Sequence, residues 1–164
     1  MAAGQDAFRA LTIGRKVAVT KTIGESDVYL FAGITGDFSP NHVDEEFMRS
    51  TRYGRRIAHG ALLVGYMSRA STEICAGLGG TIVSYGFDRI RFPAAAGIGD
   101  TVTVAYEIVK RDEADLKTFA RVTRHLHQPA GRGRGRRHPY PQGAAVTSRG
   151  NGGAVFGGSL ARTF

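Results

Sequence analysis

Residues 60–74 constrain the fold more than any other stretch of this sequence. Their apolar side chains recur at the three- and four-residue spacing of a helix that is buried along one face. Polar side chains occupy another face, and glycines at positions 77, 79 and 80 follow the stretch. The sequence therefore predicts one long apolar helix that the rest of the chain must cover; its buried positions are Leu63, Tyr66, Met67, Ala70 and Ile74.

Segments with strand character lie on both sides of this helix in the sequence. Residues 101–110 alternate strictly between apolar and polar side chains, as a half-buried strand does. Residues 11–20, 81–92 and 116–122 also favour strands, and a turn is predicted at 93–99. Because the helices precede most of the strands, a mainly antiparallel sheet packed on one long helix is favoured over alternating parallel units. The sequence thus predicts an α+β domain.

A shorter helix is predicted between Ser26 and Gly36. Serine is suited to cap the N-terminus, an acidic residue follows in the first turn, and glycine is a natural helix stop. Asp44 can cap a further helical turn over residues 45–48. The bend between these two helices carries the candidate chemistry.

Asp37 and His42 are the candidate catalytic pair of this bend. Pro40 lacks an amide hydrogen and disfavours the helical conformation at Ser39, so residues 37–42 are predicted to form a bent loop. A carboxylate and an imidazole on one rigid loop can together orient and deprotonate a water molecule. The alternative is a capping aspartate and a histidine whose hydrogen bonds are satisfied at the surface or in the core.

Gly60 is a candidate hydrogen-bond donor at the start of the long helix. The first N–H groups of a helix have no internal acceptor, and the helix dipole favours negative charge there. A glycine also allows close approach of a substrate, so its N–H can stabilise a developing enolate oxygen. The alternative is that Gly60 only permits close packing, and for the neighbouring His59 structural support is the preferred interpretation.

Two segments closely resemble the hydratase 2 motif of MaoC-like, (R)-specific enoyl-CoA hydratases of the hot-dog fold. They are residues 35–44, Thr-Gly-Asp-Phe-Ser-Pro-Asn-His-Val-Asp, and residues 55–63, Arg-Arg-Ile-Ala-His-Gly-Ala-Leu-Leu. The resemblance extends over residues 11–122 in the order of elements. It implies a hot-dog fold, in which an antiparallel β-sheet wraps around one long central helix.

The resemblance also implies roles for the motif residues. Asp37 and His42 match the family's catalytic dyad, which activates water for addition across the 2,3 double bond of an acyl thioester. Gly60 matches the glycine whose N–H polarises the thioester carbonyl, and Ser68 matches a serine that lines the site. Ser39 replaces the usual asparagine, which we expect to loosen the loop without removing its hydrogen bonds. The candidate substrate-binding residues are Ser68, Ser39, Asn41, Arg52, Arg55 and Arg56.

The three arginines between the motif segments have two interpretations. Arg52, Arg55 and Arg56 can meet the phosphates of coenzyme A. The favoured interpretation is a solvated basic turn, because charged residues of this kind usually face water.

The same resemblance implies the reaction and the partners. We expect (R)-specific interconversion of a 2-enoyl-CoA and a 3-hydroxyacyl-CoA thioester by a homodimer, with the pantetheine arm entering between protomers. Coenzyme A is part of the substrate, so neither a separate cofactor nor a metal is expected. A 3-hydroxyacyl-carrier-protein dehydratase is the near alternative, and a thioesterase ranks lower because that class does not resemble residues 36–42.

The C-terminal region differs in composition from the rest of the chain. Residues 1–123 carry 15 Lys and Arg against 14 Asp and Glu, whereas residues 124–164 carry seven Arg and no acid. We therefore predict a hot-dog domain at 1–123 and a disordered Arg/Gly-rich tail at 124–164. A frame-shifted reading of the gene is a second explanation for the composition of the tail. If the last strand of the sheet is missing, an open edge results. An alternative function of another class is RNA binding through the tail, which is disfavoured because no aromatic residue is interleaved with the arginines. A further alternative is that the chain is an inactive product of a damaged gene.

Length and cysteine content limit the remaining possibilities. A chain of 164 residues accommodates one domain with a sizeable core. Its one cysteine, Cys75, excludes an intramolecular disulfide and suits a reducing compartment. No stretch has the pattern of a secretion signal or a membrane span, so a cytoplasmic protein without membrane contact is expected.

Overall fold

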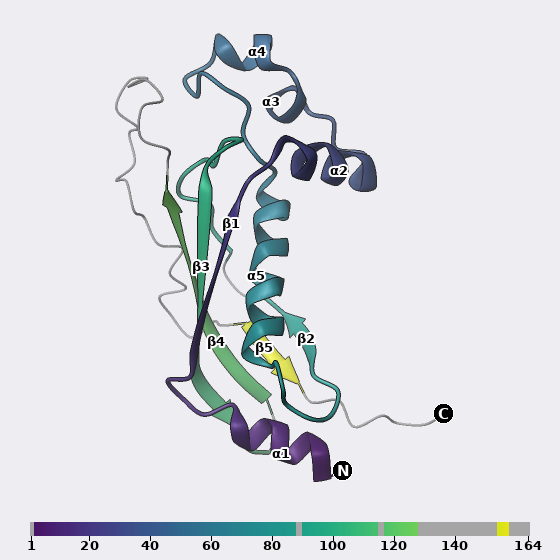
Figure 1. Ribbon diagram of the computed structural model, residues 1–164, viewed down its shortest axis with the longest axis vertical. Helices are drawn as coiled ribbons and strands as arrows, with labels where there is room; N and C mark the ends of the chain where they lie inside the picture. The colour runs from purple at the N-terminus through teal and green to yellow at the C-terminus, as the bar shows by residue number, and fades with distance from the viewer. Residues whose placement is uncertain (1, 88–89, 115–116, 128–153, 158–164) are drawn as a thin grey trace.

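The computed structural model describes residues 2–87, 90–114, 117–127 and 154–157 (Figure 1). Helices and strands both occur, as the predicted α+β class requires. In chain order the elements are α1 (Ala2–Ala10), β1 (Lys16–Thr22), α2 (Glu25–Thr35), α3 (Pro40–Val43), α4 (Glu45–Arg49), α5 (Gly60–Ile74), β2 (Val83–Gly86), β3 (Thr101–Asp112), β4 (Lys117–His127) and β5 (Ala154–Gly157).

The strands form one antiparallel sheet in the order β1-β3-β4-β5-β2. Helix α5 lies along one face of this sheet and contacts β1 and β3 (Figure 1). Helices α2, α3 and α4 gather at the end of the sheet where α5 begins, and α1 lies at the opposite end. The predicted arrangement of an antiparallel sheet on one long helix is therefore confirmed.

The core lies between α5 and the sheet. The helix buries Leu63, Met67, Ala70 and Ile74, which are at most 3% exposed. Strand β3 alternates as its sequence predicts and buries Val102, Val104, Tyr106 and Ile108. Burying one large apolar side chain of this kind stabilises the fold by roughly 1.5–3 kcal/mol. Within the described residues, no helix combines the length and the apolar character needed to cross a membrane.

The ends of the short helices follow the predictions in part. Helix α2 stops at Gly36, whose φ is 77°, and Asp44 Oδ1 caps α4 by accepting the N–H of Phe47 at 2.8 Å. The predicted N-cap of α2, Ser26, is wrong, because Gly24 holds that position. The N–H of Gly24 donates to the side chain of Asp27 at 2.7 Å, so a carboxylate within the first turn reaches back and takes over the capping role.

Three other boundaries also differ from the predictions. Helix α1 was not predicted, yet it buries Ala7 and Phe8 at the end of the sheet. Strand β1 begins at Lys16, not at residue 11, because residues up to 15 connect α1 to the sheet. The strand predicted over 81–92 is confined to Val83–Gly86.

The C-terminal region contains more strand than the composition predicts. Strand β4 continues to His127, past the predicted boundary between residues 123 and 124. Strand β5 pairs with β4 on one side and with β2 on the other, so residues 117–120 of β4 lack the open edge that a missing last strand would leave. Residues 128–153 and 158–164, for which disorder was predicted, lie outside the described residues, and the division into domain and tail stays a prediction.

A buried ion pair ties the segment before α5 to the sheet. Asp100 has 0% exposure, and each of its carboxylate oxygens accepts a hydrogen bond from Arg55 Nη2 at 2.7 Å. The N–H of Gly97 donates to the same carboxylate at 2.8 Å, and Ile57 forms an antiparallel bridge with Gly97. This anchor fixes the place at which α5 begins.

Candidate active site

Asp37 directly follows the C-terminus of α2. The N–H of Gly36 closes the helix by donating to the carbonyl of Ala32 at 2.8 Å. The N–H of Ser39 donates to Asp37 Oδ1 at 3.3 Å, which orients the carboxylate within a local turn. Because the Asp37 side chain is 49% exposed, its carboxylate remains accessible although the helix dipole disfavours negative charge at this end.

His42 lies in the helical turn α3, which corrects the prediction of a loop over all of 37–42. Pro40 begins this turn at a position where its missing N–H has no cost. His42 Nδ1 donates to the carbonyl of Ile57 at 2.7 Å, so in the neutral imidazole Nε2 carries the lone pair. This Nε2 lies 4.0 Å from Asp37 Oδ2, too far for a direct hydrogen bond but within reach of one shared water or substrate atom.

Two further hydrogen bonds join the two motif segments. The N–H of Ile57 donates to the carbonyl of Asn41 at 3.0 Å. His59 Nε2 donates to the backbone carbonyl of Asp37 at 3.0 Å. The residues that lead into α5 therefore fix the backbone next to Asp37 and next to His42. The two motif segments, which are separate in the sequence, are in contact in the fold.

Burial favours the neutral form of His42. Its side chain is 9% exposed, and desolvation lowers the pKa of the imidazole below the ordinary value of 6.5. The hydrogen bond to the Ile57 carbonyl opposes this shift, the nearby His59 adds to it, and the Asp37 carboxylate opposes it. Because the net pKa is lowered, Nε2 can accept a proton at neutral pH.

The rate of the reaction should therefore fall on the acid side with a pKa below 6.5. Protonation of His42 removes the lone pair that a base at this position needs, so kcat/KM should report this titration if His42 is that base. Asp37→Asn should move the acid limb to still lower pH in any residual activity, because it removes a charge that favours the imidazolium. An acid limb at or above 6.5 in a pH profile of the unmodified enzyme contradicts this prediction.

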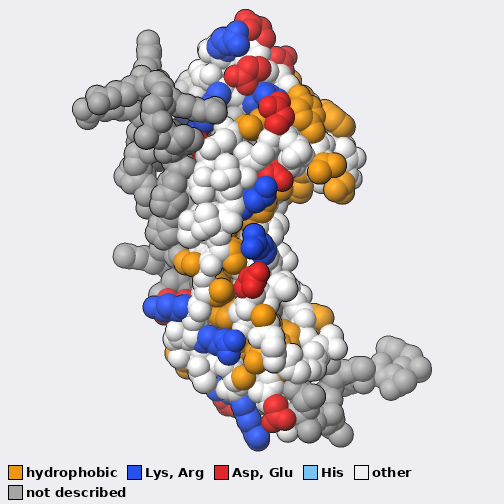
Figure 2. Space-filling view, viewed as in Figure 1, with side chains coloured by type: hydrophobic (Ala, Val, Ile, Leu, Met, Phe, Trp, Pro, Cys, Tyr) orange, Lys and Arg blue, Asp and Glu red, His pale blue; other side chains and the backbone are white. Residues whose placement is uncertain are grey.

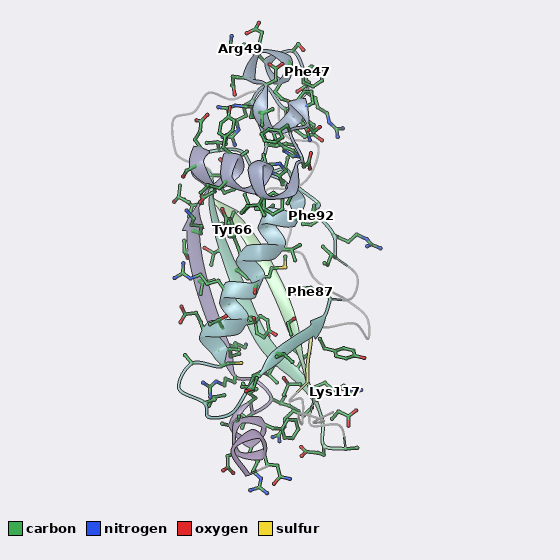
Figure 3. All side chains as sticks on the ribbon, turned by 90° about the vertical axis from the view of Figure 1, so that its right-hand side faces the viewer. Phe47, Arg49, Tyr66, Phe87, Phe92 and Lys117 are labelled. Carbon is green, nitrogen blue, oxygen red and sulfur yellow. The ribbon has the colours of Figure 1, made fainter. Side chains whose placement is uncertain are left out.

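Gly60 is the first residue of α5 and immediately follows His59. Its N–H has no acceptor within the helix and points from the positive end of the helix dipole. A Cβ atom at Gly60 would lie 3.0 Å from Cε2 of Phe92, whose ring lies beside the N-terminal part of α5 (Figure 3). Both sequence interpretations of Gly60, hydrogen-bond donor and site of close packing, thus have a physical basis.

A pair of variants separates the two interpretations of Gly60. Gly60→Ala should lower kcat/KM by roughly 100-fold, because a methyl group obstructs the approach of the reacting carbonyl to the N–H. Adding Phe92→Ala removes the packing conflict and should restore the Tm without restoring the activity. Full recovery of kcat/KM in the double variant would assign Gly60 to packing with Phe92 alone.

The other polar motif residues are divided between the dyad and a distant face. Asn41 Nδ2 lies 3.3 Å from His42 Nε2, so this side chain can steady the imidazole or a bound water. Ser39 contributes its backbone N–H to Asp37. Ser68 lies on an exposed face of α5, about 12 Å along the helix axis from Gly60 at the usual rise per residue. Asn41 and Ser39 therefore join the dyad, whereas Ser68 lies apart from it.

The three arginines between the motif segments all have partners in the fold. Arg55 binds the buried aspartate that anchors the segment before α5. Arg56 bridges a glutamate of α2 at 2.6 Å and a glutamate of α4 at 2.9 Å, and only 13% of its side chain is exposed. Arg52 donates to the hydroxyl of Tyr53 at 2.7 Å. Arg55 and Arg56 therefore connect the segments around the dyad through ion pairs. The interpretation of these two arginines as a solvated basic turn does not agree with these contacts.

The dyad and His59 are the one described group of acidic, histidine and cysteine side chains that brings three ligand-type atoms within 4.8 Å. His59 Nε2 is already committed as a donor to a carbonyl. The rings of His42 and His59 are stacked, with centroids 3.7 Å apart, so their in-plane lone pairs do not converge on one point. This geometry fits a proton-transfer pair with a packed neighbour better than it fits metal ligands.

Exposed apolar side chains lie on the α2 side of the dyad (Figure 2). Leu30 is 65% and Ile34 is 83% exposed on α2, and Phe38 is 56% exposed immediately after it. An exposed apolar patch of this kind commonly marks a ligand or protein contact. Phe38 directly follows the catalytic candidate Asp37, which places part of this patch next to the dyad.

Comparisons with known proteins agree with this geometry. The family model described as MaoC like domain matches residues 9–128. The chain is 38% identical over 101 residues to an (R)-specific enoyl-CoA hydratase of Rhodospirillum rubrum, an alignment that covers 62% of this chain and 68% of that one. The chain is also 37% identical over 103 residues to a 3-hydroxybutyryl-CoA dehydratase of Methylorubrum extorquens. This alignment covers 63% of this chain and 64% of that relative, which is slightly under two thirds of its length.

The solved structures show the same fold. The chain superimposes on an (R)-hydratase from A. caviae involved in PHA biosynthesis with a TM-score of 0.71 and 25% sequence identity, over 90% of this chain and 96% of that one. The relatives are hydratases and dehydratases by name, which makes this chain an enzyme of the hydro-lyase class. With its antiparallel sheet, its central helix and a family match over most of its length, the chain belongs to the MaoC-like domain family of hot-dog proteins.

Proposed function

We propose that this hydro-lyase interconverts a trans-2-enoyl thioester and the (R)-3-hydroxyacyl thioester, with Asp37 and His42 as its catalytic dyad. The observation that carries the proposal is the position of the unprotonated His42 Nε2, 4.0 Å from the accessible Asp37 carboxylate. Both groups lie at the entry to α5, where the Gly60 N–H has no helical acceptor. A base, an orienting carboxylate and an oxyanion donor are the groups that hydration of an enoyl thioester requires.

The reaction divides into two proton transfers around one enolate. Asp37 accepts a hydrogen bond from water and orients it, while His42 Nε2 takes one of its protons as the oxygen bonds to C3. The electron pair of the 2,3 double bond moves toward the thioester carbonyl, whose oxygen is stabilised by the Gly60 N–H. Protonated His42 then returns the proton to C2, so one water molecule is added and His42 is neutral again.

The same site and the names of the relatives support the proposed substrate class. The patch of Leu30, Ile34 and Phe38 offers apolar surface for an acyl chain or for the second protomer of a homodimer. Coenzyme A enters as part of the thioester, and the two proton transfers need no added cofactor. An acyl-carrier-protein thioester is the second candidate substrate, since the dyad acts on the thioester and not on its carrier.

Hydration of crotonyl-CoA by the purified chain tests the proposal. The enoyl absorbance should disappear, and the product should be the (R)-3-hydroxyacyl thioester on chiral analysis. No absorbance change with crotonyl-CoA, combined with turnover of the matching carrier-protein thioester, would favour the second candidate. Release of free thiol in a DTNB assay would instead assign the chain to the thioesterases.

A further inference from the structure

His59 contacts both members of the dyad, although the proposed reaction gives it no proton to move. Its side chain is 1% exposed, and its Nε2 donates to the Asp37 carbonyl at 3.0 Å. Its ring stacks on His42 with a centroid distance of 3.7 Å and an interplanar angle of 29°. The ring of Phe31 on α2 contacts His59 at 4.8 Å, so the imidazole is enclosed by aromatic neighbours.

The hydrogen bonding of His59 indicates a fixed tautomer. A carbonyl can only accept, so Nε2 carries the hydrogen and Nδ1 carries the lone pair. Nδ1 is buried without a hydrogen-bond partner among the described residues. The one hydrogen bond of the His59 side chain therefore fixes the orientation of its ring.

The surroundings of His42 make the ring of His59 relevant to the chemistry. Two titratable groups act on His42, the carboxylate of Asp37 and the imidazole of His59. The other contacts, the Asn41 amide and the Ile57 carbonyl, are uncharged. The imidazole of His59 opposes a positive charge on His42, whereas the Asp37 carboxylate favours one.

We propose that His59 is a positioning residue that fixes the Asp37 backbone and the His42 ring relative to each other. His59 acts through two contacts, the hydrogen bond of its Nε2–H and the stacking of its ring on His42. The Nε2–H holds the peptide from which the carboxylate projects, and the stacked ring fixes the plane in which His42 Nε2 faces that carboxylate. The inference rests on the proposed function of the dyad, but its test also has readouts that need no turnover.

Two variants remove the two contacts separately. His59→Gln keeps a side-chain N–H that reaches as far as Nε2 but loses the stacked ring, whereas His59→Phe keeps a ring and loses the donor. Each should lower kcat by roughly 100-fold with little change in KM, because a misplaced dyad binds substrate normally but reacts slowly. Both variants should also raise the pKa of His42 in an NMR titration, because each removes the second imidazole. Phe31→Leu, the matched control, alters packing against His59 only and should leave the His42 titration unchanged.

The outcomes separate positioning from mere packing. A lower Tm with an unchanged His42 titration and an unchanged kcat would show that His59 only fills space, and would overturn the inference. If both variants unfold, ¹⁵N spectra of the unmodified protein still decide, since the donor bond to the Asp37 carbonyl requires His59 to be an Nε2–H tautomer. An Nδ1–H tautomer of His59 refutes the inference even if crotonyl-CoA is hydrated, and a failure to hydrate any thioester refutes the proposed function while the NMR result stands.

Discussion

His42→Ala is expected to lower kcat for hydration of crotonyl-CoA by about 1,000-fold, within the range that general acid–base groups contribute. The variant removes the Nε2 lone pair that accepts the proton of water. Asp37→Asn should have a similar effect, because an amide orients water less well and no longer stabilises the imidazolium that forms during the reaction. Steady-state kinetics with each purified variant measures both losses.

Controls must separate lost chemistry from lost structure in these two variants. Asp37 is half exposed and nearly isosteric with asparagine, so Asp37→Asn should melt like the unmodified protein. His42 is buried and donates to the Ile57 carbonyl, so His42→Ala should lower the Tm to some extent. Added imidazole should restore part of the activity of His42→Ala only. Retained activity in both variants would remove the dyad from the mechanism.

Asp100→Ala is expected to destabilise the fold by about 3 kcal/mol, because it removes the fully buried carboxylate of an ion pair and leaves the partly buried Arg55 guanidinium behind. The variant leaves the Arg55 guanidinium without its carboxylate and the N–H of Gly97 without an acceptor. Since Arg55 leads directly into the segment that holds His42, activity should fall together with stability. Urea denaturation followed by circular dichroism measures the change in the free energy of unfolding.

A matched surface pair provides the comparison for Asp100→Ala. Arg49 and Glu46 are joined at 2.8 Å on α4, but their side chains are 66% and 84% exposed. Glu46→Gln should therefore leave the midpoint of denaturation almost unchanged, since exposed pairs are screened by water and salt. If both substitutions shift the midpoint equally, the buried pair does not anchor the segment before α5.

The sequence predicts the dyad and the long helix because their signals are local. Pro40 and Gly36 restrict the backbone around Asp37 and His42 whatever the rest of the chain does. The apolar spacing of residues 60–74 likewise identifies a buried helix without knowledge of its partners. The end of α2 at Gly36 and the long helix α5 therefore agree with the structure, whereas the catalytic role of Asp37 and His42 stays a prediction.

The partners of His59, Arg55 and Arg56 could not be found in this way. Each depends on a partner from a distant segment, such as the Asp37 carbonyl for His59 and the Asp100 carboxylate for Arg55. A charged residue in a turn favours solvent when only its neighbours in the sequence are considered. Strand β5 was missed for a related reason, because it occurs in a region whose composition favours disorder and becomes a strand through pairing with β2 and β4.

The order of strands in the sheet has a consequence for synthesis of the chain. Strand β2 has β5 as its strand neighbour, although β5 is the last of the described elements in chain order and is synthesised well after β2. At about 5–20 residues per second, β2 waits on the order of seconds before that neighbour emerges. Throughout that interval the nascent chain presents unpaired edges on both β2 and β4, which are the kind of surface that chaperones shield and that other nascent chains can join. Translation that stops before residue 154 would make those open edges permanent.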